Sequence, residues 1–166
     1  AGFSDGGFAV NGIPYSDAMG WLDQATALFR GYGFHGGYAG QRPFYAVFLA
    51  AAYHFFGESL ETGRVINLVC GALSCMFLFL FIARATGRRG IALAAVSAFL
   101  FAQQQLTDLQ LLITEPMGLT FIIAGAYAWW AGLLRMNPWA LFAAGALIGL
   151  SNVTRTFTML GLPLFA

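Results

Sequence analysis

The sequence contains no lysine and little charge of either sign. Its 166 residues carry eight arginines and seven acids, so only 9% of the chain is charged. Soluble domains average about 25% charged residues, and this chain is 59% hydrophobic. The composition excludes an ordinary soluble domain and predicts an integral membrane protein surrounded by membrane lipids. The net charge of +1 gives no basis for a nucleic-acid partner, and we expect none.

Motifs of common soluble enzymes are also missing. The sequence has no P-loop, no GxSxG and no GxGxxG. His35 and His54 are isolated and no HExxH is present, so no zinc site is expected. The two cysteines, Cys70 and Cys75, lie five positions apart inside an apolar run. On a helix they face different sides, so we expect two free thiols that pack as small hydrophobic side chains.

Long uncharged runs are abundant in the second half of the chain. Each has eighteen or nineteen residues, close to the ~20 that cross a bilayer core. None alternates with period two, as the strands of a barrel would. We therefore predict an all-α, polytopic helical membrane protein with four to five transmembrane helices, the fifth beginning at Thr156. The four complete spans are Val65–Ala83, Gly90–Thr107, Pro116–Leu134 and Met136–Thr154.

The charges predict the orientation of these spans. The loops that join the first span to the second and the third to the fourth contain four arginines and no acid: Arg84, Arg88, Arg89 and Arg135. By the positive-inside rule these loops are cytoplasmic. The acids then fall on the exoplasmic side: Asp5, Asp17, Asp23, Glu58, Glu61, Asp108 and Glu115. Any chemistry should face away from the cytoplasm.

Residues 1–63 form the predicted exoplasmic part, and residues 64–166 the transmembrane bundle. Ser16 to Arg30 reads as an amphipathic helix lying along the membrane face, with Asp17, Gln24 and Arg30 off its apolar stripe. Pro43 to Phe56 reads as a second helix, about 21 Å long and too short to span. The members of the apolar stripe are Ala18, Trp21, Leu22, Ala25, Leu28 and Phe29.

Two further features of the sequence carry expectations. Gly145 and Gly149 form a GxxxG pattern in the last span, which favours close packing of helices. The chain begins without methionine and stops inside an apolar run. We therefore expect it to be a piece of a longer membrane protein.

Charged groups at a membrane boundary are costly unless they are paired or used. Asp17 and Glu115 both stand at predicted helix starts, where an acid that only complements the helix dipole is the simpler explanation. Arg64 also has a simpler explanation than a role in function, because it can form an ion pair with Glu61 or Glu58 nearby in the sequence.

The other candidates lie in predicted loops or at span ends. Asp108 follows the sequence QQQLT in an expected exoplasmic turn. Arg42 and Arg155 have no evident local partner, and either suits a phosphate or a lipid headgroup.

The order of these features resembles the GT-C membrane glycosyltransferases. In that pattern an acid opens the first exoplasmic loop, an aromatic follows four residues later and alanines continue the helix, as do Asp17, Trp21 and Ala25 here. The closest likeness is to the branch with dolichyl-phosphate-mannose protein mannosyltransferases and bacterial aminoarabinose and lipopolysaccharide-core transferases. The later matching segments, between Tyr15 and Phe157, are GYGFHGGYAGQ, RPFY, YHFFG, ETGRVINLVCGAL, RATGRRG, LLITEPMGLTFIIAG and GLSNVTRTF.

This resemblance implies an inverting transfer of a sugar from a polyprenyl-phosphate donor to a glycan, lipid or protein acceptor, on the exoplasmic face. It implies that Asp17 is the catalytic base, although the glutamate that often follows that acid is Ala18 here. Glu115 then orients the sugar or, with Asp17, holds a divalent cation (Mg, Mn or Ca). The remaining expected substrate-binding residues are Arg42, Arg155, Arg64 and Asp108.

We expect location in a bacterial inner (plasma) membrane, with the site facing the periplasm or exterior. Two other functions stay open on the sequence. One is a non-catalytic polytopic scaffold or accessory subunit that keeps the fold without the chemistry. The other is a lipid or solute transporter, although no long span has a charge in its middle and no inverted repeat is visible.

Overall fold

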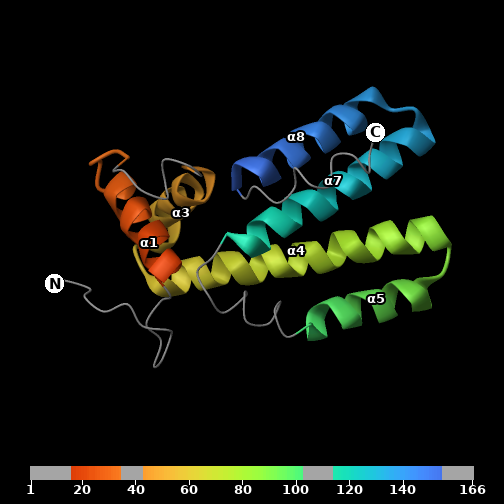
Figure 1. Ribbon diagram of the computed structural model, residues 1–166, viewed down its shortest axis with the longest axis horizontal. Coiled ribbons are helices and arrows are strands. Elements are labelled where there is room, and N and C mark those ends of the chain that lie inside the picture. Colours follow the sequence, from red (N-terminus) through yellow and green to blue (C-terminus); the bar gives the residue numbers. More distant parts are fainter. Residues whose placement is uncertain (1–15, 35–42, 103–113, 155–166) are drawn as a thin grey trace.

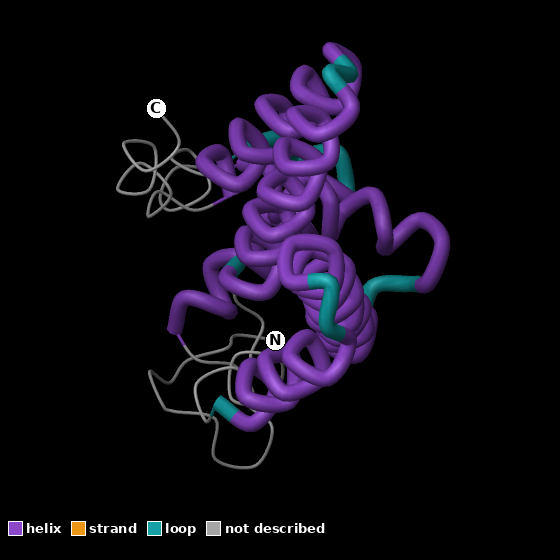
Figure 2. Tube along the Cα trace, turned by 90° about the vertical axis from the view of Figure 1, so that its right-hand side faces the viewer, coloured by secondary structure: helices purple, strands orange, loops and turns teal. Residues whose placement is uncertain are grey.

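A computed structural model describes residues 16–34, 43–102 and 114–154, with side chains from residue 20 onward (Figure 1). Within these ranges the chain forms helices joined by loops and has no strand (Figure 2). The predicted all-α fold is confirmed. In chain order the helices are α1 (Ser16–Phe29), α3 (Pro43–Phe56), α4 (Leu60–Thr86), α5 (Arg89–Phe101), α7 (Glu115–Arg135) and α8 (Pro138–Thr154).

Among the described helices, α4 and α7 are long and apolar enough to cross a membrane, with 27 and 21 residues. The helices α5 and α8 are apolar but shorter, with 13 and 17 residues, below the ~20 needed for a perpendicular span. The predicted span Gly90–Thr107 is therefore not one continuous helix, because α5 ends at Phe101 and Ala102 is extended. The polar sequence QQQ begins at the next position.

The two ends of the bundle differ in charge. The α4–α5 and α7–α8 turns lie together at one end, and α1 and α3 lie at the other (Figure 1). The arginines at 84, 88, 89 and 135 belong to the first end, where the guanidinium of Arg84 lies 5.1 Å from the ring centre of Tyr127. The described acids Asp23, Glu58, Glu61 and Glu115 belong to elements at or near the second end.

Polar contacts connect the three central helices. The Thr120 hydroxyl of α7 donates to the Cys70 carbonyl of α4 at 2.8 Å and lies 2.9 Å from the Ser74 hydroxyl. The Ser151 hydroxyl of α8 donates to the Gly118 carbonyl of α7 at 2.8 Å. Small polar residues at such interfaces allow close approach and satisfy each other where no water is present. Cys70 and Cys75 are free thiols, as expected.

The close helix packing occurs at other glycines than those of the GxxxG pattern. A methyl group placed on Gly145 or Gly149 would meet nothing within 4 Å, so this expectation is wrong for the described part of the chain. Instead, Gly125 and Gly132 of α7 face α8. The pattern misleads because Gly145 and Gly149 share a face of α8 that is turned away from α7.

Replacing Ser151 by alanine should lower the free energy of unfolding by about 0.6 kcal/mol and by no more than about 1.7 kcal/mol. The substitution leaves the buried Gly118 carbonyl without this hydroxyl donor. Thermal unfolding in detergent, followed by tryptophan fluorescence, measures the change. Ser97→Ala, at an exposed position of α5, is the matched control. Equal stabilities of the two variants would contradict the prediction.

Candidate functional site

The helix that begins at Ser16 packs against α3 along its length. Trp21 is buried and meets Tyr45 edge-on, with ring centres 6.2 Å apart. Two turns later Phe29 meets Tyr53 in the same way at 5.9 Å. Trp21 near the start of α1 contacts Tyr45 near the start of α3, and Phe29 at the end of α1 contacts Tyr53 near the end of α3. The two helices therefore run parallel. The described members of the predicted stripe pack into a core with α3: Trp21, Leu22, Ala25, Leu28 and Phe29. The contact of this face with α3 was not predicted from the sequence.

One residue expected off that stripe is buried. Gln24 is 4% exposed, and its side-chain nitrogen donates to the Gly33 carbonyl at 3.1 Å. The amide reaches the turn that follows α1 and holds the backbone there. Hydropathy alone places glutamine on the solvent side, but the turn after α1 supplies an acceptor that makes its burial favourable.

Asp17 lies on the first turn of α1, one helical turn before Trp21. Its backbone is therefore at the end of α1 that adjoins Tyr45, and its side chain lies outside the described part. The Tyr45 hydroxyl donates to the Asn67 side-chain oxygen of α4 at 3.3 Å, in a buried setting. The start of α1 is thus fixed next to the start of α3 and the second turn of α4.

Glu115 is the first residue of α7, where an acid also complements the helix dipole. It is half-buried, and the Thr114 hydroxyl donates to its carboxylate at 3.4 Å. The same part of α7 reaches the α1–α3 core, because Met117 is buried within that cluster. Phe121 meets Phe44 edge-on at 5.7 Å. The helix starts that bear Asp17 and Glu115 therefore adjoin the same core.

Arg64 is already paired. It bonds Glu61 at 2.6 Å, which confirms one of the two local pairings weighed from the sequence. Glu58 bonds instead to Arg30, with its carboxylate accepting from the guanidinium at 3.0–3.3 Å. This contact ties the end of α1 to the turn between α3 and α4.

Three expected substrate-binding residues, Arg42, Asp108 and Arg155, lie outside the described part of the chain. Among the residues that are described, no three His, Cys, Asp or Glu side chains form a group that could hold a metal ion. The Asp17 side chain is not among them, so a cation between Asp17 and Glu115 stays a prediction.

The two tyrosines that join α1 to α3 were not singled out from the sequence. Burial raises the pKa of Tyr45, with smaller contributions from Cys70 and Tyr53. Burial and then the nearby Glu58 raise the pKa of Tyr53 from 10.0 to about 12. The sequence signal that could have found these tyrosines is the four-residue spacing of Tyr45, Leu49 and Tyr53. In the structure all three side chains are buried.

The α1–α3 contact should weaken between pH 10 and pH 12. The raised pKa means that the fold favours the neutral Tyr53 phenol. Its contribution is complete below the unfolded value near 10 and is lost as the pH rises through about 12. Absorbance of the phenolate near 295 nm, compared with Tyr53→Phe, follows this ionisation. Tyr32→Phe, at an exposed position, should not remove the phenolate absorbance that appears as Tyr53 ionises near pH 12. Ionisation of Tyr53 near pH 10 in the folded protein would contradict this.

Comparison with known proteins identifies the family of this chain. The family model for dolichyl-phosphate-mannose-protein mannosyltransferase matches residues 12–164, which is most of the chain. No curated protein and no solved structure matches. The matched region includes the six helices described above and every candidate site residue. The chain therefore belongs to the dolichyl-phosphate-mannose-protein mannosyltransferase family, GT-C membrane glycosyltransferases that take their sugar from a polyprenyl-phosphate donor.

Proposed function

We propose that this protein transfers a sugar, with inversion, from a polyprenyl-phosphate donor to an acceptor hydroxyl on the exoplasmic face of the membrane. Asp17 is the base in this proposal. The observation that carries it is the position of Asp17 at the start of α1, beside the core that also receives the start of α7 and Glu115. The family match over residues 12–164 supports the donor class.

The reaction makes clear demands on such a site. The acceptor hydroxyl has a pKa far above 7, so a carboxylate within hydrogen-bond reach must take its proton as it attacks the anomeric carbon. The bond from that carbon to the donor phosphate oxygen breaks, and the polyprenyl phosphate leaves with the electron pair. One displacement inverts the anomeric carbon. The proton ends on Asp17.

Charge on the departing phosphate grows in the transition state and needs cationic partners. Arg42 and Arg155 are proposed for this role. Arg64 ranks below them because Glu61 already compensates its charge at 2.6 Å. A divalent cation held by Asp17 and Glu115 would supply the same stabilisation, since Mg, Mn and Ca prefer oxygen ligands. Asp108 and Glu115 are further proposed to orient sugar hydroxyls.

The proposed side of the membrane follows from the charge difference between the two ends of the bundle. The arginine-bearing turns face the cytoplasm by the positive-inside rule, which places α1 on the other side. An Asp17→Cys variant, in a protein with Cys70 and Cys75 replaced by alanine, can be labelled with a membrane-impermeant thiol reagent to test this orientation. Labelling from the exoplasmic side is expected. Labelling from the cytoplasmic side alone would overturn the orientation.

The direct test uses the full-length protein in vesicles with polyprenyl-phosphate mannose and candidate acceptors. A new glycosidic bond of inverted configuration, identified by NMR of the anomeric proton, is expected. Retained configuration would exclude the single displacement. A protein that forms no product with any donor would be a scaffold, and one that moves the donor lipid without forming a bond would be a transporter.

A further inference from the structure

Helix α4, which is long and apolar enough to span the membrane, carries a fully buried polar side chain. Asn67 is 0% exposed and lies in the apolar segment VINLVCGAL. A polar side chain at such a place is costly unless it is bonded, and it commonly serves a function. The Asn67 side-chain oxygen accepts from the Tyr45 hydroxyl of α3 at 3.3 Å. Tyr45 is also 0% exposed, so the hydrogen bond is closed to solvent.

This hydrogen bond supports the first turn of α1. The Tyr45 ring that carries the hydroxyl packs edge-on against Trp21 of α1, with ring centres 6.2 Å apart. Position 17 lies four residues before Trp21 on α1, and it is therefore on the same face of that helix, one turn away. A continuous series of contacts thus runs from the turn that bears Asp17, through Tyr45, to Asn67 of α4.

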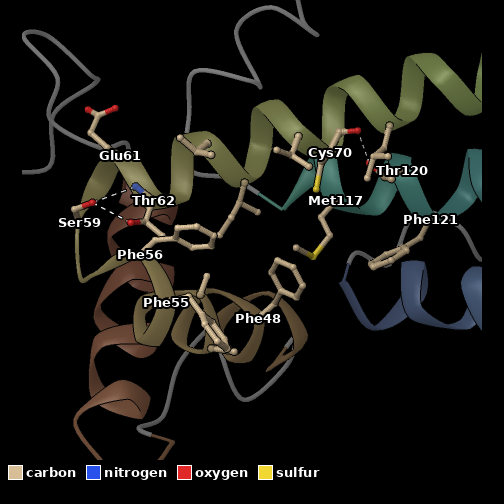
Figure 3. Close-up of a pocket in the computed structure, with 16 residues that line it drawn as sticks. Phe48, Phe55, Phe56, Ser59, Glu61, Thr62, Cys70, Met117, Thr120 and Phe121 are labelled. Atoms are coloured by element: carbon tan, nitrogen blue, oxygen red, sulfur yellow. Dashed lines mark hydrogen bonds between the residues drawn. The ribbon is translucent and has the colours of Figure 1, made fainter.

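The same turn of α4 also holds α7. Cys70 comes three residues after Asn67, and its backbone carbonyl accepts from the Thr120 hydroxyl of α7 at 2.8 Å (Figure 3). Helix α7 begins at Glu115, the second acid of the proposed sugar site. One turn of α4 therefore supports both helix starts and contributes to the spacing between positions 17 and 115.

A groove separates much of α3 from α4. This apolar groove of about 690 Å³ is lined along α3 by residues between 48 and 56, and it has Ser59 and Thr62 at one end (Figure 3). Tyr45 and Asn67 do not line it. Their hydrogen bond therefore attaches α3 to α4 outside the groove, in the first turn of α3. Without this bond, the start of α3 and its contact with α1 lose a polar link to the bundle.

The far end of α1 is held in a different way. The carboxylate of Glu58, in the turn between α3 and α4, accepts from the Thr26 hydroxyl at 3.1 Å and from the Arg30 guanidinium at 3.0–3.3 Å. The Arg30 and Glu58 side chains are exposed or partly exposed, and ion pairs in such places are worth little. Helix α1 thus has an exposed attachment far from Asp17 and a buried one next to it.

We propose that Tyr45 and Asn67 are positioning residues for sugar transfer, which hold the first turn of α1 where Asp17 meets the acceptor hydroxyl. The proposal rests on the proposed function, because it takes Asp17 as the base. A general base must lie within hydrogen-bond reach of the proton that it takes, and a misplacement of about 1 Å costs up to about 100-fold in rate. A hydrogen bond that only joins α3 to α4 would affect folding alone, so the two roles give different results.

The position of the first turn can be tested without sugar transfer. In the full-length Asp17→Cys protein, with Cys70 and Cys75 replaced by alanine, a thiol reagent reacts at position 17. Tyr45→Phe keeps the aromatic ring and removes only the hydroxyl. It should raise the rate of this reaction by about 2- to 10-fold, the effect of one hydrogen bond on the balance between a closed and an open first turn. Tyr53→Phe, at the tyrosine that contacts the far end of α1, should leave the rate unchanged. Equal rates in the two variants would overturn the inference.

Sugar transfer then tests whether this position matters for the reaction. In the full-length protein with its cysteines unchanged, Tyr45→Phe should lower kcat by about 10- to 100-fold and leave the KM for the donor within about twofold. In the Asp17→Asn protein the same substitution should cause no further loss, because the group that it positions is gone. Equal losses in both backgrounds, or the same loss in Tyr53→Phe, would overturn the inference. Full transfer by Asp17→Asn would instead refute the base, and the rates of thiol labelling would still decide how position 17 is held.

Discussion

Replacing Asp17 by asparagine in the full-length protein should lower sugar transfer by about 10²–10⁴-fold, the usual contribution of a positioned general base. Asparagine keeps the size of the side chain but cannot accept the acceptor's proton. The rate of product formation from a polyprenyl-phosphate sugar, measured at saturating donor and acceptor, gives the effect. The loss should fall on kcat, because proton transfer occurs in the chemical step.

The same variant should remain folded. As an acid in the first turn of α1, Asp17 contributes to the helix dipole interaction, which is worth about 0.3–1 kcal/mol. Asp23→Asn is the control, since Asp23 is exposed on the same helix and has no proposed role. It should transfer sugar at nearly the normal rate. Unchanged transfer by Asp17→Asn would refute the assignment, and equal losses in both variants would indicate a structural effect.

The second large effect concerns the packing of α7 on α8. A methyl group at Gly132 would lie 2.9 Å from a Leu141 side-chain carbon and 3.1 Å from the Leu141 backbone nitrogen. A flexible side chain can yield, but the backbone of α8 cannot move without disturbing its helix. Gly132→Ala should therefore lower the free energy of unfolding by about 1–3 kcal/mol, the range for an overpacked interface.

The control substitution is expected to raise the free energy of unfolding, where Gly132→Ala lowers it. Gly149→Ala introduces the same methyl group where nothing lies within 4 Å. Alanine in a helix interior is favoured over glycine by about 0.5–1 kcal/mol, so this variant should be slightly more stable. Thermal unfolding in detergent compares the two proteins. A Gly132→Ala protein as stable as Gly149→Ala would show that α7 and α8 do not pack as closely as described.

Helix α3 was predicted at its observed bounds because local signals mark both ends. Pro43 suits a first helical turn, and Gly57 adopts the left-handed conformation (φ 85°) that ends helices. The extents of the uncharged runs predicted α4 and α7 well for a similar reason, since the cost of burying charge in lipid is a property of single residues.

The contacts between helices could not be predicted in this way. The buried Gln24 donates to the Gly33 carbonyl, nine positions further along the chain, and the hydropathy pattern does not indicate that partner. Glu58 meets Arg30 across 28 positions, although Arg64 was nearer in the chain. The glycine pattern in α8 failed because the rotation of a helix about its axis depends on the fit of whole surfaces.

The sequence by itself determined that this is an all-α membrane protein, where most of the described helices lie, and which end is acidic. These follow from hydropathy, charge and the conformations open to proline and glycine. Only the tertiary structure decided that α1 and α3 run parallel, that the starts of α1 and α7 adjoin one core, and that a groove with one polar end separates α3 from α4. Such features depend on contacts between residues far apart in the chain, which arise only when the helices pack.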